Sequence, residues 1–380
     1  MNILYDIIGV PFGLLMSLIY KIFGNYAVAI IVFTIVTKLI LLPVNYSTQK
    51  NQARMQLLSG KMEKLKKSYA NNPERFQTEQ QKLYQQEGIN PMASCLPAFV
   101  QMFLLFGVID VIYKPITHIL HITKSVRTAA VAVASELIGG KGLSTSNLRC
   151  ELITMEQVDK NPDAFASLSE NFLNVVSQFN SKFTVFGANL GSTPTLHPET
   201  WTREAIILCI IPFVAGASQL IASIYSMIHQ KKTNPDLQGG GCMNVMMLLM
   251  PVWSVWLAFS LPAGIGFYWI WTSLISFLIN FGLNLYFTPE RTKEINEKEK
   301  RKAQLYAEKH PGKKTFMQRL MEQQAELERQ QNESQKKDDN GNKISRSEMN
   351  KQNYDRIKEA RRRMAEKYGD EYDEKDNDEE

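Results

Sequence analysis

One charged residue lies inside a long apolar segment near the N-terminus. Residues 30–43, IIVFTIVTKLILLP, contain Lys38, with the hydroxyl groups of Thr34 and Thr37 within about one helical turn of it. A charge at the centre of a bilayer costs about 2.5–3.5 kcal/mol on insertion scales, so such residues usually face a wet cavity and serve a function. An ammonium group in a low dielectric attracts an anion more strongly than it does in water. The segment therefore predicts a site that binds a carboxylate or another anionic group.

A purely structural role for Lys38 is also open, because its side chain could snorkel to the headgroups. Lys38 lies five residues before Pro43, which is about 7.5 Å along a helix. The other apolar segments carry isolated polar residues too, which could line one hydrophilic groove with Lys38 or could hydrogen-bond neighbouring helices together. These residues are Gln101, Ser218, Gln219, Thr272, Ser273 and Ser276.

Charge is distributed unevenly along the 380 residues. Of the 81 Asp, Glu, Lys and Arg residues, 46 follow Phe287. The first three quarters of the chain is therefore poor in charge, which predicts a membrane-embedded body followed by a soluble tail.

Five segments are long and apolar enough to cross a hydrocarbon core, which takes about 20 residues of helix. The last two come from one apolar block that is broken by LPAG, residues 261–264. The sequence thus predicts an all-α polytopic membrane protein whose five transmembrane helices form a groove. The predicted spans are 25–43, 95–113, 205–227, 244–261 and 265–287.

The N-terminal segment, residues 1–24, is apolar but contains Asp6, Pro11 and Gly13. No loop beyond Gly24 and Asn25 separates it from the next span. We expect an amphipathic helix that lies in the membrane interface, with a sixth span as the alternative.

The predicted loops indicate an orientation. Residues 44–94 hold eight basic residues against four acidic ones, whereas residues 114–204 hold eight of each. Short basic loops stay in the cytoplasm. We therefore expect 44–94, 228–243 and the charged tail 288–380 in the cytoplasm, and the N-terminus and 114–204 outside.

The cytoplasmic segment 44–94 reads as a helical hairpin. Met55, Leu58, Met62, Leu65 and Tyr69 recur at steps of three and four, which is typical of a coiled-coil seam. In NNPERF, residue 72 is suited to cap a second helix and residue 73 to occupy its first position. The hairpin is either a docking surface or a connector.

The outer segment and the tail carry little motif information. A helix is expected over residues 163–179, and the GGG at 239–241 reads as a flexible linker. The tail beyond residue 288 is rich in charged residues and is expected to be partly disordered.

Motifs for chemistry are missing from the sequence. No phosphate-binding loop, acid–base pair or Ser/His/Asp order is present, and the four cysteines and five histidines show no metal-ligand spacing. We expect a protein that is not an enzyme and needs no cofactor.

Four sequence blocks resemble the YidC/Oxa family of membrane protein insertases, in its short Gram-positive form. They are GNYAVAIIVFTIVTKLILLPV, LYQQEGINPMASCLPAFVQMFLLFGV, VFGANLGSTP and MMLLMPVWSVWLAFSLPAGIGFYWIWTS. The resemblance covers about residues 1–290, with departures at Lys38, where the family usually has arginine, at Ala93-Ser94, where glycine is common, and in a longer outer segment at about 125–180.

The resemblance implies a five-span core whose groove opens to the cytoplasm and to lipid. A cation in the first span draws the hydrophilic segment of a nascent membrane protein into this groove without ATP, and the apolar part slides into the bilayer. Lys38 takes the place of this cation, and we expect Thr34, Thr37, Gln101, Gln219, Ser273 and Trp269 to line the groove with it. It also implies a bacterial plasma membrane location, with the ribosome, the Sec translocon and targeting factors as candidate partners of the tail and the hairpin.

Two other functions fit the same residues. A small-solute transporter would also place polar groups inside the membrane, although such proteins tend to show internal repeats, and none is found between the first and last spans. A noncatalytic scaffold that anchors ribosomes through the tail is the second alternative.

Overall fold

The computed structural model describes residues 2–89, 96–139, 143–168, 170–233 and 241–309. Most of the Asn-Pro and Cys-Leu-Pro block, most of the Gly-rich linker and the tail after residue 309 lie outside these residues. The chain divides into two compact units, Met1–Ala303 and Gln304–Glu380. All contacts described below belong to the first unit.

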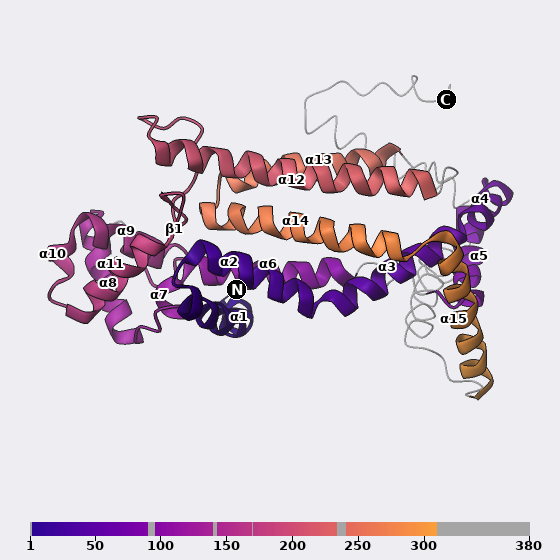
Figure 1. The fold of residues 1–380 in the computed structure, drawn as a ribbon, viewed down its shortest axis with the longest axis horizontal. Coiled ribbons are helices and arrows are strands. Elements are labelled where there is room, and N and C mark those ends of the chain that lie inside the picture. The colour runs from indigo at the N-terminus through magenta and orange to yellow at the C-terminus, as the bar shows by residue number, and fades with distance from the viewer. Residues whose placement is uncertain (1, 90–95, 140–142, 169, 234–240, 310–380) are drawn as a thin grey trace, which may run out of the picture. The chain divides into compact units, whose positions relative to one another are not determined.

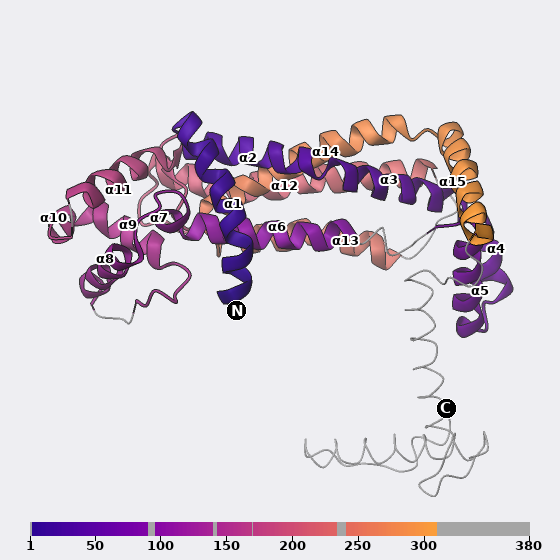
Figure 2. The same ribbon diagram turned by 90° about the horizontal axis from the view of Figure 1, so that it is seen from below.

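Long apolar helices make up the body of this unit, and α14 packs against both α2 and α12. Helices α2, α6, α12, α13 and α14 run in roughly the same direction in both views, whereas α1 is seen nearly end-on in Figure 1 and runs across them in Figure 2. The bounds are α1 Asn2–Phe23, α2 Tyr26–Ile40, α3 Leu42–Leu57, α6 Leu96–Tyr113, α12 Arg203–Thr233, α13 Gly241–Ala258 and α14 Ala263–Tyr286.

Two helices in the described part of the chain are long and apolar enough to cross a membrane, Arg203–His229 and Ala263–Tyr286. The pair α2 and α3 passes the same test when taken together, although the two helices are bent by 55°. Shorter apolar helices cover Gly9–Phe23, Phe99–Tyr113 and Leu248–Ala258. The described residues therefore form a mostly helical membrane protein with two or three helices of spanning length.

Helices α12, α13 and α14 expose apolar surface. Soluble monomers rarely expose contiguous apolar patches above a few hundred Å², so these faces suit contact with lipid tails. The exposed side chains include Ile206, Ile210, Phe213, Ile221, Ile224 and Ile228 on α12, Leu248, Leu249, Met250, Val252, Trp253 and Trp256 on α13, and Leu274, Leu278, Phe281 and Leu285 on α14.

The first predicted span does not end in a loop. Helix α2 stops at Ile40, and α3 begins at Leu42 with Pro43 in its first turn. Proline has no N–H to donate and its ring clashes with the carbonyl four residues earlier, so a helix bends or restarts there. The chain thus leaves Lys38 through a bend and continues as a helix as far as Leu57.

The hairpin is completed by α4, Ser59–Ser68, and α5, Pro73–Gln86. The predicted cap of α5 is confirmed, because the Asn72 side chain accepts a hydrogen bond from the backbone N–H of Arg75 at 3.1 Å. The predicted seam over 55–69 is interrupted at Leu58, where α3 ends and α4 begins.

The predicted tail begins with a long helix, α15, Pro289–Lys309. Its Asn296 and Glu299 contact Arg54 and Lys50 of α3, and its Lys300 contacts Glu87 at the end of α5. These contacts could not be read from the sequence, in which residues 289–309 look like the start of a solvated charged segment.

The outer segment forms a small helical cluster at one end of the long helices (Figure 1). Its core contains Phe165, Phe172, Phe179 and Phe183. The single helix expected over 163–179 is wrong, because a turn at 166–168 separates α10 from α11. A short antiparallel strand pair was also not predicted. The elements are α7 Pro115–His118, α8 Lys124–Leu137, α9 Cys150–Lys160, α10 Pro162–Phe165, α11 Glu170–Lys182, β1 Thr184–Val185 and β2 Ala188–Asn189.

Candidate functional site

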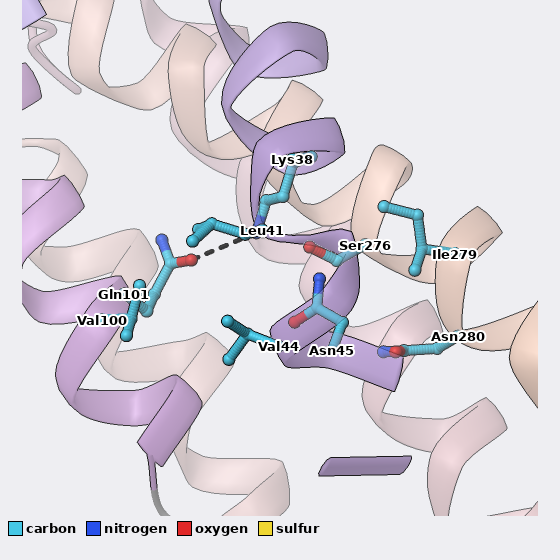
Figure 3. A pocket seen from close by; sticks show the side chains of 9 residues that line it. All are labelled: Lys38, Leu41, Val44, Asn45, Val100, Gln101, Ser276, Ile279 and Asn280. Carbon is cyan, nitrogen blue, oxygen red and sulfur yellow. Dashed lines mark hydrogen bonds between the residues drawn. The ribbon is translucent and has the colours of Figure 1, made fainter. Parts of the chain in front are cut away.

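Lys38 and Gln101 meet inside the helical body. Lys38 lies in the last turn of α2, and only 7% of it is exposed. Its Nζ donates a hydrogen bond to Gln101 Oε1 of α6 at 3.1 Å (Figure 3). The two residues that the sequence singled out in different spans are therefore direct partners.

A cavity of about 290 Å³ adjoins this pair. The side chains around it come from α2, α3, α6 and α14, and from Leu41 between α2 and α3. Figure 3 shows Asn45, Ser276 and Asn280 on the side of the cavity away from Gln101. The lining residues are Lys38, Leu41, Val44, Asn45, Val100, Gln101, Ser276, Ile279 and Asn280.

Among these lining residues, Lys38 is the one charged group. Its hydrogen-bond partner Gln101 is a neutral carboxamide, and the lining contains no carboxylate that could neutralise the ammonium. Buried charges are normally paired, because desolvation costs several kcal/mol per ion. The cavity is thus suited to an anionic group that enters it, with the carboxamides and the Ser276 hydroxyl as further hydrogen-bonding groups.

The hydroxyl groups of the two threonines beside Lys38 donate hydrogen bonds to carbonyls of their own helix. Thr34 Oγ1 donates to the Ile30 carbonyl at 2.7 Å, and Thr37 Oγ1 donates to the Phe33 carbonyl at 2.8 Å. Such bonds to the preceding turn are a common way to bury a hydroxyl in an apolar helix. Neither threonine lines the cavity, and their assignment to the groove stays a prediction.

The other three predicted groove residues also lie outside the cavity lining. Gln219 Oε1 accepts a hydrogen bond from Ser254 Oγ at 3.0 Å, which joins α12 to α13. Trp269 is partly buried and packs against the apolar core, and Ser273 is partly buried on the same helix. Their predicted contact with a substrate is not tested by this arrangement.

The sequence reasoning missed Asn45 and Asn280. Asn45 follows Pro43, where the first span was expected to have ended, so it was assigned to the hairpin. Asn280 lies four residues after Ser276, on the same face of α14. This repeat was the available signal for Asn280.

The described residues contain no group of three or more His, Cys, Asp or Glu side chains that could hold a metal ion. Hydrogen-bonding groups and one cation thus account for the polar chemistry of the cavity lining.

These features define a helical membrane protein with a cationic, polar cavity between apolar helices. The family model for the 60Kd inner membrane protein matches residues 18–290. The chain therefore belongs to this family, the YidC/Oxa family, as the resemblance indicated.

Several relatives carry the name membrane protein insertase YidC. The protein of Clostridium perfringens is 40% identical over 89 residues, which are 23% of this chain and 37% of the relative. The protein of Clostridium tetani is 42% identical over 83 residues, 22% of this chain and 38% of the relative. The protein of Fusobacterium nucleatum is 32% identical over 112 residues, 30% of this chain and 55% of the relative. The matched part thus spans about two fifths to just over half of these three relatives.

Proposed function

We propose that this chain is a membrane protein insertase. The observation that carries the proposal is the buried, uncompensated ammonium of Lys38 in a polar cavity, within a chain of the YidC/Oxa family. The cation attracts the hydrophilic segment of a nascent membrane protein into the cavity. The apolar segment of the substrate then moves along the exposed apolar helices into lipid, and no ATP is used.

The proposed topology has five spans in a bacterial plasma membrane, with a groove open to the cytoplasm, the N-terminus outside and the C-terminus inside. The basic loop 44–94 supports this orientation. Helix α1 is proposed to lie in the outer interface, which is supported by its steep crossing of the other helices in Figure 2. Val10, Leu14, Leu18 and Ile22 form an exposed apolar stripe along it, as an interfacial helix requires.

The partners in this proposal are nascent membrane proteins and the lipid bilayer. The hairpin receives substrates or targeting factors, the tail contacts the ribosome, and the Sec translocon is a further partner. The basic excess of residues 44–94 supports a docking role for the hairpin.

Insertion into liposomes tests the function. Purified protein is reconstituted, a single-span substrate with an acidic N-terminal tail is added, and protease protection of the tail is scored against empty liposomes. Wild type and Lys38→Arg are expected to insert the substrate, whereas Lys38→Leu should lose most of the protection. Lys21→Leu is the matched control, because Lys21 is an exposed lysine on α1.

Two results would contradict the proposal. Protection by wild type at the level of empty liposomes would exclude insertase activity for this substrate. Equal protection by wild type and Lys38→Leu would show that Lys38 is a snorkelling anchor and does not recruit the substrate.

A further inference from the structure

Helix α14 carries polar residues at four-residue intervals. Ser276, Asn280 and Asn284 lie on one face of this mainly apolar helix. Helix α3 packs against α14 and carries Asn45 and Gln49, which are also four residues apart. Two rows of uncharged polar side chains therefore run along neighbouring helices.

The two rows face each other. In Figure 3, Asn280 and Ser276 reach from α14 toward the side of the cavity where Asn45 lies. One helical turn further along both helices, Gln49 Nε2 donates a hydrogen bond to Asn284 Oδ1. The rows thus start at the cavity beside Lys38 and end at a direct contact between α3 and α14.

Two further contacts fasten α3 beyond this point. Lys50 Nζ lies 3.4 Å from Glu299 Oε1, and Arg54 Nε donates to Asn296 Oδ1 at 2.9 Å. Both partners belong to α15, the helix that follows α14. Three side-chain contacts therefore join α3 to α14 and α15 on the hairpin side of the cavity, and the Gln49–Asn284 hydrogen bond is the one nearest the cavity.

We propose that Asn45, Ser276, Asn280 and Asn284 form an uncharged subsite for the backbone of an extended polypeptide, and that the Gln49–Asn284 hydrogen bond is its gate. The subsite lies next to the Lys38 subsite, so that Lys38 binds an acidic side chain while the carboxamides bind the main chain. This inference depends on the proposed insertase function and adds to it the part of the substrate that is bound and the path by which it arrives.

The chemistry of the rows fits a polypeptide backbone. A carboxamide both donates and accepts hydrogen bonds, as a peptide group does. Residues four apart on a helix are about 6 Å apart along its axis, and in an extended chain the groups on one side repeat about every 6.6–6.8 Å. Successive side chains of α14 can therefore meet successive peptide groups. Such partners matter in an apolar surrounding, where an unpaired backbone group is costly.

The gate follows from the same geometry. A polypeptide that lies between α3 and α14 and continues toward the hairpin must separate Gln49 from Asn284, because their side chains join the ends of the two rows. Opening requires the loss of one neutral hydrogen bond, and the substrate backbone can then replace the lost partner of each carboxamide.

A disulfide in place of the Gln49–Asn284 hydrogen bond tests whether this contact is a gate. In a background with the native cysteines replaced by alanine, Gln49→Cys/Asn284→Cys is oxidised, reconstituted and assayed for insertion before and after reduction. We expect oxidation to lower insertion at least tenfold and reduction to restore it. The matched control is Thr184→Cys/Asn189→Cys, which links directly paired residues of β1 and β2, and its oxidation should leave insertion unchanged.

Asn280→Leu tests the backbone subsite. Two substrates are compared, one with an acidic tail and one with a tail of serine and asparagine. We expect Asn280→Leu to reduce the insertion of both by the same factor, at least threefold, whereas Lys38→Leu reduces only the first. Circular dichroism and gel filtration of the variant identify any loss of folding.

The outcomes separate the two levels of inference. If wild type inserts neither substrate, the proposed function fails. If the oxidised gate pair inserts as well as the reduced pair, the gate is overturned while the insertase function stands. If Asn280→Leu affects only the acidic tail, or neither, the carboxamides do not bind the backbone.

Discussion

Replacing Arg54 by methionine should weaken the contact of α15 with the hairpin. Only 3% of Arg54 is exposed, and its guanidinium reaches three acceptors at once. Nη2 donates to the Glu87 carbonyl at 2.8 Å, Nη1 to the Gly88 carbonyl at 3.2 Å, and Nε to Asn296 Oδ1 at 2.9 Å. One side chain on α3 therefore ties the end of α5 to α15.

The size of the effect follows from these three bonds. A hydrogen bond to a charged group contributes about 1.5–3 kcal/mol. We count each bond at the low end of this range and the long bond to Gly88 for less. The three bonds then contribute about 3–4 kcal/mol to the free energy of local opening. Methionine fills part of the volume but leaves both carbonyls without this partner. Since 1.4 kcal/mol corresponds to a factor of ten, local opening should become about a hundred to a thousand times more frequent.

Hydrogen exchange of the purified protein measures this opening. Amides of α15 and of the end of α5 should exchange faster in Arg54→Met by that factor, while amides of α12 and α14 should not change. Arg54→Lys should lie between the two, because lysine keeps the charge and loses the planar fork. Arg75→Met, at an exposed position of α5, is the control. Unchanged exchange in Arg54→Met would refute the view that this residue holds the three segments together.

Two further predictions concern the packing of α1 and the helical cluster of residues 114–190. A Cβ atom at Gly13 would lie 2.5 Å from Nδ1 of His118, and Nε2 of the same ring lies 2.7 Å from Asp110 Oδ2. Gly13→Ala should therefore lower the free energy of unfolding by about 1–3 kcal/mol, because the site is overpacked. Gly282→Ala meets nothing within 4 Å and should be neutral or stabilising; equal thermal midpoints for the two variants would contradict the close packing of α1. Burial raises the pKa of Glu151, so the folded state favours the protonated carboxyl, and stability is lost as the pH rises from the ordinary glutamate value toward the raised one. Glu151→Gln should remove this part of the pH dependence, which chemical denaturation followed at several pH values would show, and a variant with the same pH profile as wild type would exclude the effect.

Part of the site could be predicted from local sequence. Lys38 and Gln101 stand out because each is a polar residue in an apolar segment, and such residues are costly in a membrane unless they find partners. The cap at Asn72 was also predictable, because an asparagine followed by proline starts a helix by local hydrogen bonding. These predictions depend on interactions within one turn of helix or on the cost of placing a residue in lipid.

The remaining features depend on contacts between distant segments. Pro43 indicates that the first helix ends or bends nearby, but a proline alone does not show whether the chain continues as a loop or as a second helix. Residues 289–309 have the composition of a solvated tail, and their docking to the hairpin follows only from contacts between distant residues, such as Arg54 with Asn296 and Lys300 with Glu87. Asn45 and Asn280 lie 235 positions apart in the sequence, so their shared cavity follows from the packing of α3 against α14.

Helix α3 contacts the cavity beside Lys38 at one end and the hairpin and α15 at the other. At its start, Val44 and Asn45 line the cavity beside Lys38, and about 14 Å further along the helix Arg54 binds the end of the hairpin and α15. The hydrogen bond of Gln49 to Asn284 lies between these two points. The proposed gate therefore predicts that a partner which pulls the hairpin away from α15 also separates α3 from α14, because both contacts are made by the same helix. In this proposal, docking at the hairpin and opening of the polar cavity are one movement.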